Sequence, residues 1–355
     1  MNRKINIIIP GIIKSGGMNV ILEYSYRLKT KGFDIVLYYP FAYYNHYTGK
    51  NEYSWNPRRS YWAIKNYIKG RINKKFIKDI KIIGVPFIRD NFVRDANYTI
   101  ATSWPTSFDV SKLSYHKGIK YYLIQDFEKW DSNVNLVNES YKLDLIRITT
   151  CSYLKDKLLT DYGIHSDEIL NGIDYDTYFP SIKKDYDTKE KTISYIDYKL
   201  EKKNTKLVIE AIKMIRDEFP HVKFKSFGLE KFNEHPSYVK FYKNPLPEEI
   251  ANIYNESHIF IFASREEGFG LPPAEAMACK TSVISSPVGA VPEYSLNEKS
   301  VLFISPENVE SIVEKTRLLL NDNILNKSIA ENGFSMVRNT LNWENSVEKL
   351  IYLLS

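Results

Sequence analysis

Short apolar runs alternate with stretches of helical periodicity along the first half of the chain. Apolar runs of four to seven residues are typical of buried strands, and apolar residues spaced by three and four positions are typical of helices. The predicted elements are strands at 5–9, 34–39, 98–101, 120–125 and 147–151, and helices at 17–31 and 153–162. This order predicts an α/β protein with a parallel sheet.

A second series begins after Pro180, where the polar stretch 181–191 is predicted as a linker. The elements predicted beyond it are strands at 192–196, 222–227, 258–262 and 281–285, and helices at 205–218, 247–255 and 344–354. The pattern predicts two Rossmann-like doubly wound domains in series, 1–180 and 181–341. Ligands bind beyond the carboxyl ends of strands in such sheets, so we expect the two domains to face a central cleft.

Composition agrees with an ordinary two-domain protein. The chain has 355 residues, of which 43% are hydrophobic, enough for two cores. Cys151 and Cys279 form no disulfide framework, and no Cys/His cluster has metal-ligand spacing. The first apolar run is too short for a signal peptide, and no run reaches the roughly 18 residues of a membrane helix. These features predict a cytoplasmic protein.

The net charge of +6 is unevenly distributed. Residues 56–84 contain nine lysines and arginines against the single acid Asp79, interleaved with aromatic and isoleucine side chains. Such a segment suits an anionic membrane surface or a lipid-linked partner. A solvated helix with its apolar face in the core is the open alternative. No nucleic-acid-binding motif is present, so we expect no nucleic acid partner.

The most informative motif follows the apolar run 259–263. Two carboxylates, Glu267 and Glu275, lie on either side of a glycine turn that opens a helix. Gly268 and Gly270 allow the backbone to turn tightly and expose its amides, and the two prolines after the turn suit the first helical positions. Helix amides favour an anion or a hydroxyl-rich ligand. A glutamate that only complements the helix dipole is the alternative.

A second glycine loop, at 10–18, lies between a predicted strand and a predicted helix. Phosphate-binding loops occur at this position, but the sequence matches neither G-x-G-x-x-G nor the Walker A spacing. Dehydrogenase and Walker-type NTPase functions therefore lose support. The pair Gly16 and Gly17 permits close approach of a ligand, or only a tight turn.

The spacing of Glu267 and Glu275, with GFGLP between them and EAMA following, resembles the retaining glycosyltransferases of family 4, which have the GT-B fold. Weaker landmarks follow in the order of that family at 16–17, 171–174, 289–293 and 342–344. The resemblance implies that the last helix, 342–355, crosses back to the N-terminal domain. It also implies donor-sugar contacts from Glu267, Gly268, Phe269, Gly270 and Leu271, a ribose contact from Glu275, and a place by the donor diphosphate for Gly16 and Gly17.

A diphosphate leaving group needs positive charge, and no Asp-x-Asp metal motif is apparent. The family uses an arginine and a lysine after the first strand of its C-terminal domain. Lys203 matches the lysine, whereas Tyr198 occupies the arginine position and Asp197 that of a glycine. We therefore expect Lys203 and the neighbouring Lys199 to neutralise the diphosphate, with no metal and no cofactor besides the nucleotide-sugar donor.

The predicted acceptor side lies in the N-terminal domain. Gln125 stands where many family members have a histidine, and Asp126 matches the acid beside it, an arrangement that resembles bacterial rhamnosyltransferases of surface polysaccharides. Asp126 is the candidate catalytic residue that orients or deprotonates the acceptor hydroxyl, and Glu267 is the candidate at the sugar. A strand-end acid that caps a turn is the alternative for Asp126. Trp104 offers a stacking face for a sugar or belongs to the core.

The resemblance implies a metal-independent, retaining transfer of a sugar from a nucleotide-diphosphate donor to a saccharide acceptor, free or lipid-linked, in cell-surface polysaccharide synthesis. The expected location is cytoplasmic or peripheral at the inner face of the plasma membrane. Because the arginine and the histidine of the family are missing, a catalytically inactive carbohydrate- or nucleotide-sugar-binding scaffold is the alternative. The glutamate motif argues against a nucleotide-sugar epimerase of the same architecture.

Overall fold

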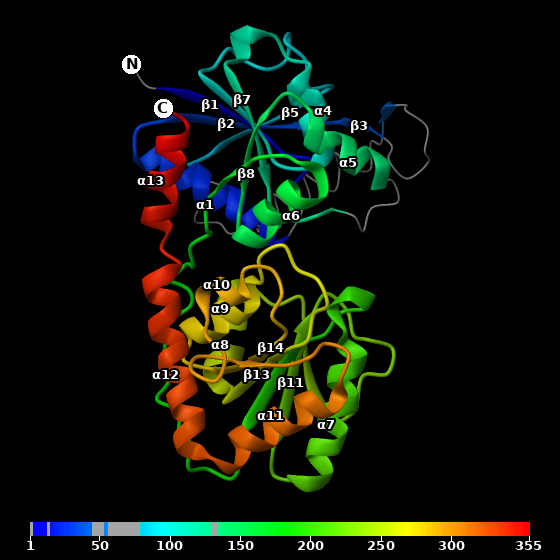
Figure 1. Ribbon diagram of the computed structural model, residues 1–355, viewed down its shortest axis with the longest axis vertical. Coiled ribbons are helices and arrows are strands. Elements are labelled where there is room, and N and C mark those ends of the chain that lie inside the picture. Colours follow the sequence, from blue (N-terminus) through cyan, green and yellow to red (C-terminus); the bar gives the residue numbers. More distant parts are fainter. Residues whose placement is uncertain (1–2, 13–14, 45–52, 56–78, 129–133) are drawn as a thin grey trace. The chain divides into compact units, whose positions relative to one another are not determined.

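The computed structural model describes residues 3–12, 15–44, 53–55, 79–128 and 134–355. The chain forms two compact units, Met1–Asn171 with Glu344–Ser355, and Gly172–Trp343 (Figure 1). These bounds differ from the predicted division at 180/181, because residues 172–180 belong to the second unit. Most of the basic segment, 56–78, lies outside the described residues, so its membrane contact stays a prediction.

The N-terminal unit is built on a parallel sheet with the strand order β5-β2-β1-β6-β7-β8-β9. This is the Rossmann order, in which the chain starts in the middle of the sheet and reverses direction at a switch point between β1 and β6. The strands are β1 (Lys4–Ile8), β2 (Asp34–Pro40), β5 (Lys81–Val85), β6 (Tyr98–Ala101), β7 (Ile119–Ile124), β8 (Ile146–Thr149) and β9 (Asp167–Glu168). A separate antiparallel pair, β3 (Ala42–Tyr44) and β4 (Tyr53–Trp55), follows β2.

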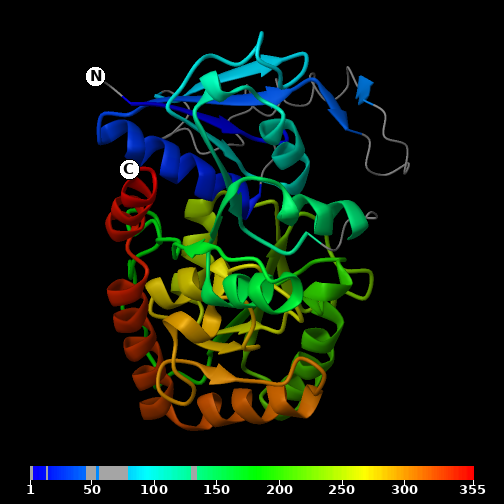
Figure 2. The same ribbon diagram turned by 45° about the horizontal axis from the view of Figure 1, so that its top comes forward.

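The helices of this unit are α1 (Gly16–Thr30), α4 (Trp104–Ser111), α5 (Val134–Lys142), α6 (Ser152–Tyr162), α13 (Trp343–Leu353) and the short 3₁₀ turn η2 (Tyr115–Lys117). Helix α13 packs on this unit although it ends the chain. Its Glu344 forms an ion pair with Lys31 at the end of α1, and the Tyr121 hydroxyl donates to the Leu353 carbonyl at 2.9 Å. Figure 2 shows α1 and α13 side by side.

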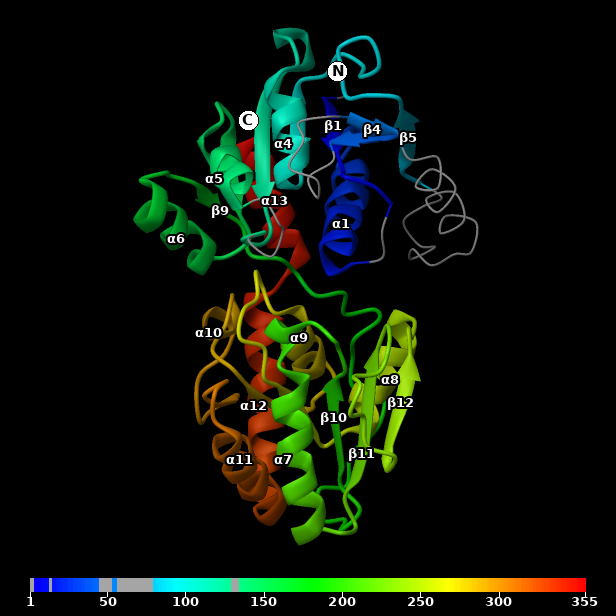
Figure 3. The ribbon, with the colours of Figure 1, turned by 90° about the vertical axis from the view of Figure 1, so that its right-hand side faces the viewer.

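The C-terminal unit repeats the same topology, with the strand order β12-β11-β10-β13-β14-β15. Its strands are β10 (Thr192–Ile196), β11 (Lys223–Gly228), β12 (Val239–Lys243), β13 (Ile259–Phe262), β14 (Ser282–Ser285) and β15 (Leu302–Phe303). All four residues of β13 are buried, as expected for a central parallel strand covered on both faces. Figure 3 shows this sheet with α7 beside it.

The helices of the C-terminal unit are η3 (Glu201–Lys203), α7 (Thr205–Glu218), α8 (Pro247–Glu256), α9 (Leu271–Ala278), α10 (Val291–Tyr294), α11 (Val309–Asn321) and α12 (Asn323–Thr340). Helix α11 packs against α7, and α12 packs against α9 and α11. Helices α11 and α12 were not predicted from the sequence. One residue separates them: Asp322 ends α11, and its side chain caps α12 by accepting from the Leu325 amide at 2.8 Å.

The described elements confirm the predicted fold class, two Rossmann-like parallel sheets of α/β type. The predicted strands agree with the structure to within about two residues, because continuous apolar runs mark buried parallel strands. Strands β3, β4, β9 and β15, of two or three residues each, were not predicted. The longer strands β5 and β12 were not predicted either. Their alternation is weak, since Lys81, Lys240 and Lys243 interrupt the apolar pattern.

Candidate functional site

The carboxyl ends of β10 and β13 meet at the switch point of the C-terminal sheet. These two strands are neighbours, pairing Ile193 with Ile259, although 62 residues lie between the end of β10 at Ile196 and the start of β13 at Ile259. The loop after β10 carries Tyr198 and Lys203, and the loop after β13 carries Glu267. Ligands of open α/β sheets bind at such switch points, so the topology alone brings these predicted site residues to one place.

Lys203 and Glu267 form an ion pair at this place. The distance from Lys203 Nζ to Glu267 Oε1 is 2.5 Å, and the two side chains are 20% and 12% exposed. The ammonium group also lies 5.9 Å from the ring centroid of Tyr198. A charge pair shielded to this extent is held in a defined geometry, and removing one partner would leave the other charge poorly solvated. The structure therefore unites two residues that the sequence analysis assigned to different parts of the donor.

The glycine turn after Glu267 has a conformation that other residues would strain. Gly270 has φ +88°, and a Cβ atom on it would lie 2.8 Å from Val291 Cγ2. Phe269 is buried and stacks on Tyr294 with 6.0 Å between ring centroids. The Tyr294 hydroxyl in turn donates to the Gly270 carbonyl. The contacts of Tyr294, in α10, therefore hold the turn in place, and the shape of the turn depends on glycine at position 270.

Helix α9 begins directly after this turn, at Leu271. Pro272 and Pro273 occupy its next two positions, where they lack the N–H groups that other residues would present. The helix start therefore offers fewer free amides than a start without proline would.

Glu275 lies in the second turn of α9. Burial raises the pKa of its carboxyl group to about 7, and the negative charge of Asp174 acts in the same direction. The hydroxyls of Tyr178 and Tyr254 oppose this shift. A carboxyl group with such a pKa changes protonation near neutral pH.

Tyr198 is the site residue that sequence reasoning treated only as a departure. Burial raises the pKa of its hydroxyl, and the charges of Glu267 and Glu275 raise it further. Its ring therefore lies within the electrostatic reach of both carboxylates as well as beside Lys203. The only sequence signal for this role was its position after β10.

Lys199 lies apart from the Lys203–Glu267 pair. It forms an ion pair with Glu230 in the loop after β11, with 3.0 Å between Lys199 Nζ and Glu230 Oε2 and with exposed fractions of 45% and 61%. Exposed pairs of this kind are weak and easily exchanged.

Asp197 is buried, accepts from the Phe232 amide at 2.7 Å, and lies 2.7 Å from His235 Nδ1. It thereby anchors the loop that carries Glu230.

In the N-terminal unit, the structure brings Gly17 and Gln125 together. Gly16 and Gly17 are the first residues of α1, and Ser15 caps this helix by accepting from the Met18 amide at 3.1 Å. A Cβ atom on Gly17 would lie 3.3 Å from Gln125 Oε1. The missing side chain therefore makes room for the Gln125 amide group, which explains one of the two glycines by packing.

Asp126 follows Gln125 at the end of β7 and is half-buried. Its charge, with that of Glu128, contributes to the raised pKa of the buried Tyr141. Its catalytic role stays a prediction.

Trp104 is 1% exposed and packs edge-on against Phe108, with 6.2 Å between ring centroids. The ring therefore presents no open face to a sugar in this structure. This placement agrees with the core alternative.

Within the described ranges, no group of three or more His, Cys, Asp or Glu side chains is arranged to hold a metal ion. None of the helices in the described part of the chain is long and apolar enough to cross a membrane.

Two Rossmann-type units, one of which presents a charged pair and a glycine turn at its switch point, define the architecture of a GT-B protein. Residues 180–336 match the family model of the group 1 glycosyl transferases. The chain is 26% identical over 247 residues to the capsular polysaccharide biosynthesis glycosyltransferase CapM from Staphylococcus aureus, an alignment that covers 64% of this chain and 63% of CapM. It is 27% identical over 152 residues to an uncharacterized glycosyltransferase from Methanocaldococcus jannaschii, covering 41% of this chain and 42% of that protein.

Solved structures match the whole chain at low identity. Anabaena HepE in complex with UDP-glucose superimposes with a TM-score of 0.75 at 13% identity, covering 99% of both chains. Sucrose-phosphate synthase from Thermosynechococcus elongatus gives a TM-score of 0.72 at 14% identity, covering 99% of this chain and 98% of that chain. These likenesses confirm the GT-B fold class.

Proposed function

We propose that the protein is a family 4 glycosyltransferase that moves a sugar from a nucleotide-diphosphate donor to a saccharide acceptor, with retention of configuration and without a metal ion. The observation that carries this proposal is the Lys203–Glu267 pair, 2.5 Å long, at the switch point of the C-terminal sheet. The UDP-glucose bound in the HepE structure and the part of CapM in capsular polysaccharide biosynthesis support a donor of this class and a place in surface polysaccharide synthesis.

The donor roles follow from charge. Lys203 would turn from Glu267 toward the leaving diphosphate and neutralise its developing charge, which stabilises the transition state electrostatically. Glu267, released from its partner, would accept hydrogen bonds from the sugar hydroxyls. Lys203 would then be paired with the diphosphate and Glu267 hydrogen-bonded to the sugar hydroxyls, and this limits the cost of opening the ion pair.

Glu275 would accept from the ribose hydroxyls. On the acceptor side, Asp126 would orient or deprotonate the attacking hydroxyl. Retention would proceed by attack on the face from which the diphosphate departs, so no protein nucleophile is required. Transfer of a deoxyhexose such as rhamnose, and a lipid-linked acceptor at the inner membrane face, are the more specific parts of the proposal.

A nucleotide screen followed by a transfer assay tests the proposal. UDP-, dTDP- and GDP-sugars are compared by thermal shift, since a ligand at 100 times its Kd stabilises the native state by about 2.7 kcal/mol. The sugar that binds is then supplied with oligosaccharide acceptors in the presence of EDTA, and NMR reads the anomeric configuration of the product. We expect transfer with retention that EDTA does not abolish.

Three outcomes would contradict the proposal in different ways. Tight donor binding without transfer or donor hydrolysis would favour the scaffold alternative. An inverted product would reject retention, and activity lost in EDTA and restored by a divalent cation would reject metal independence.

A further inference from the structure

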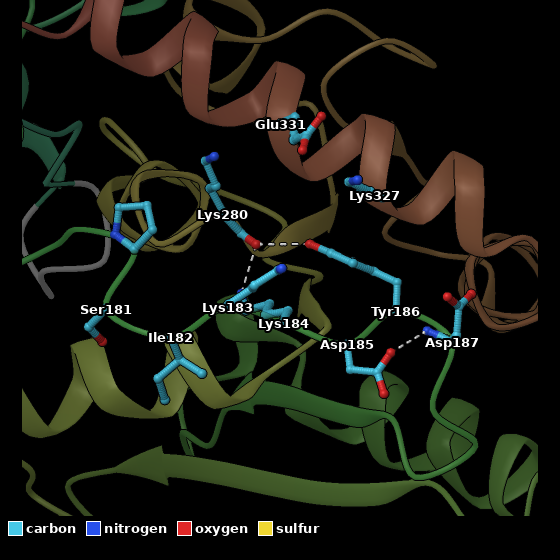
Figure 4. A pocket seen from close by; sticks show the side chains of 11 residues that line it. Ser181, Ile182, Lys183, Lys184, Asp185, Tyr186, Asp187, Lys280, Lys327 and Glu331 are labelled. Atoms are coloured by element: carbon cyan, nitrogen blue, oxygen red, sulfur yellow. Dashed lines mark hydrogen bonds between the residues drawn. The ribbon is translucent and has the colours of Figure 1, made fainter.

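The connecting segment 178–187 runs along the far end of helix α9 in the C-terminal unit. Lys184, in this segment, directs its ammonium group at the end of the helix. It donates to the Cys279 carbonyl at 3.1 Å, to the Lys280 carbonyl at 2.7 Å and to the Thr281 hydroxyl at 2.7 Å. Figure 4 shows Lys184 below Lys280, with the dashed hydrogen bond to the Lys280 carbonyl.

The end of α9 needs such support because of its backbone. The Thr281 amide donates to the Ala276 carbonyl at 3.0 Å and the Lys280 amide to the Met277 carbonyl at 2.9 Å, which is the Schellman pattern of a helix C-terminus. That pattern places one residue in the left-handed region, usually glycine. Here this residue is Lys280, with φ +52°, a conformation that costs a residue with a side chain about 1 kcal/mol.

The number of donors on Lys184 equals the number of its acceptors. In its protonated form, Lys184 carries three N–H bonds, and each has a partner at the helix end. Burial lowers the pKa of Lys184 to about 7. The thiol of Cys279 beside it has a pKa raised to about 12 by burial, so Lys184 binds neutral acceptors at the negative end of the helix dipole.

We propose that Lys184 is a positioning residue for the donor site, because it fixes the end of the helix whose other turns carry Leu271 and Glu275. The coupling is short: the Cys279 amide donates to the Glu275 carbonyl at 3.2 Å, so the clamped residue and the ribose glutamate are one helical turn apart. This inference rests on the proposed function, since it assigns Lys184 to the same donor site.

A matched control lies next to Lys184 in the chain. Both lysines line an open pocket of about 760 Å³, together with Lys327 and Glu331 of α12 (Figure 4). The side chain of Lys183 is exposed, unlike that of Lys184. Lys183→Met therefore removes a lysine charge from the pocket while it leaves the helix clamp intact.

The test compares Lys184→Met, Lys183→Met and the double variant Lys184→Met/Lys280→Gly in the full chain. The probe is UDP, dTDP or GDP, whichever stabilised the wild type most in the screen, with Kd measured by calorimetry. We expect Lys184→Met to weaken binding about tenfold and to speed amide hydrogen exchange in residues 271–281. Lys183→Met should match the wild type, and glycine at 280 should restore much of the binding because it removes the backbone strain.

An unchanged Kd and unchanged exchange in Lys184→Met would overturn the inference. So would an equal loss in Lys183→Met, which would indicate a general charge effect, or a double variant no better than Lys184→Met, which would refute the helix-end argument. A wild type that binds none of the three nucleotides would instead overturn the proposed function. In that case the exchange of residues 271–281 would still decide whether Lys184 clamps α9.

Discussion

Glu275 should lower the stability of the folded protein at neutral and alkaline pH. Its folded pKa of about 7 lies above the ordinary glutamate value of 4.5 because its carboxyl group is buried. The protonated form is therefore favoured in the folded state. The stability that it contributes is complete below pH 4.5 and is lost as the pH rises through 7.

The size of the effect follows from that difference. Each pKa unit corresponds to about 1.4 kcal/mol, so ionised Glu275 costs the folded state roughly 3 kcal/mol above pH 7. Glutamine has nearly the same shape and stays neutral. The free energy of unfolding of Glu275→Gln should therefore exceed that of the wild type at pH 8, and this advantage should shrink by roughly 2 kcal/mol at pH 5.

Urea unfolding followed by circular dichroism at both pH values measures this difference. Glu314→Gln, on the exposed face of α11, is the control for removing one negative charge. Glu275→Gln should also bind the nucleotide more weakly, because an amide replaces the carboxylate that accepts from ribose. A stability difference between variant and wild type that is the same at pH 5 and pH 8 would refute the reasoning.

Further substitutions separate site residues from packing residues. Lys203→Met should lower kcat/KM for the donor about a hundredfold, whereas Lys199→Met should change it less than about threefold because its ion pair is exposed; equal losses in steady-state assays would contradict the assignment. Gly270→Ala should lower the free energy of unfolding by more than roughly 2 kcal/mol, since it combines a positive φ with a steric clash. Gly163→Ala, with φ +66° and open space around it, should cost only about 1 kcal/mol, and urea midpoints compare the two. Trp104→Ala should lose about 3–5 kcal/mol of stability while the folded fraction keeps its acceptor KM; a raised acceptor KM would instead restore the stacking role.

The sequence was sufficient for most of the fold because parallel strands are marked locally. Runs such as 259–263 are apolar throughout, and burial on both faces leaves them no other role. Helices α11 and α12 were missed for a local reason as well, since Asp322 alone ends one helix and begins the next.

The partners of the candidate residues could not be obtained in this way. Lys203 pairs with Glu267, 64 residues away, whereas Lys199 pairs with Glu230. Both lysines follow β10 in the same polar loop, and nothing in their spacing distinguishes them. The choice depends on which strand lies on each side of β10, since β13 brings Glu267 and β11 brings Glu230.

The two series of strands and helices, and the glycine turn between Glu267 and Glu275, could be predicted from the amino-acid sequence because periodicity and turn chemistry act over a few residues. The folded structure was needed to show that Trp104 is buried, that burial raises the pKa of Glu275, and that Lys184 donates to the end of α9. Burial, charge pairing and helix capping depend on contacts between segments that are distant in the sequence, and these segments meet only in the folded protein.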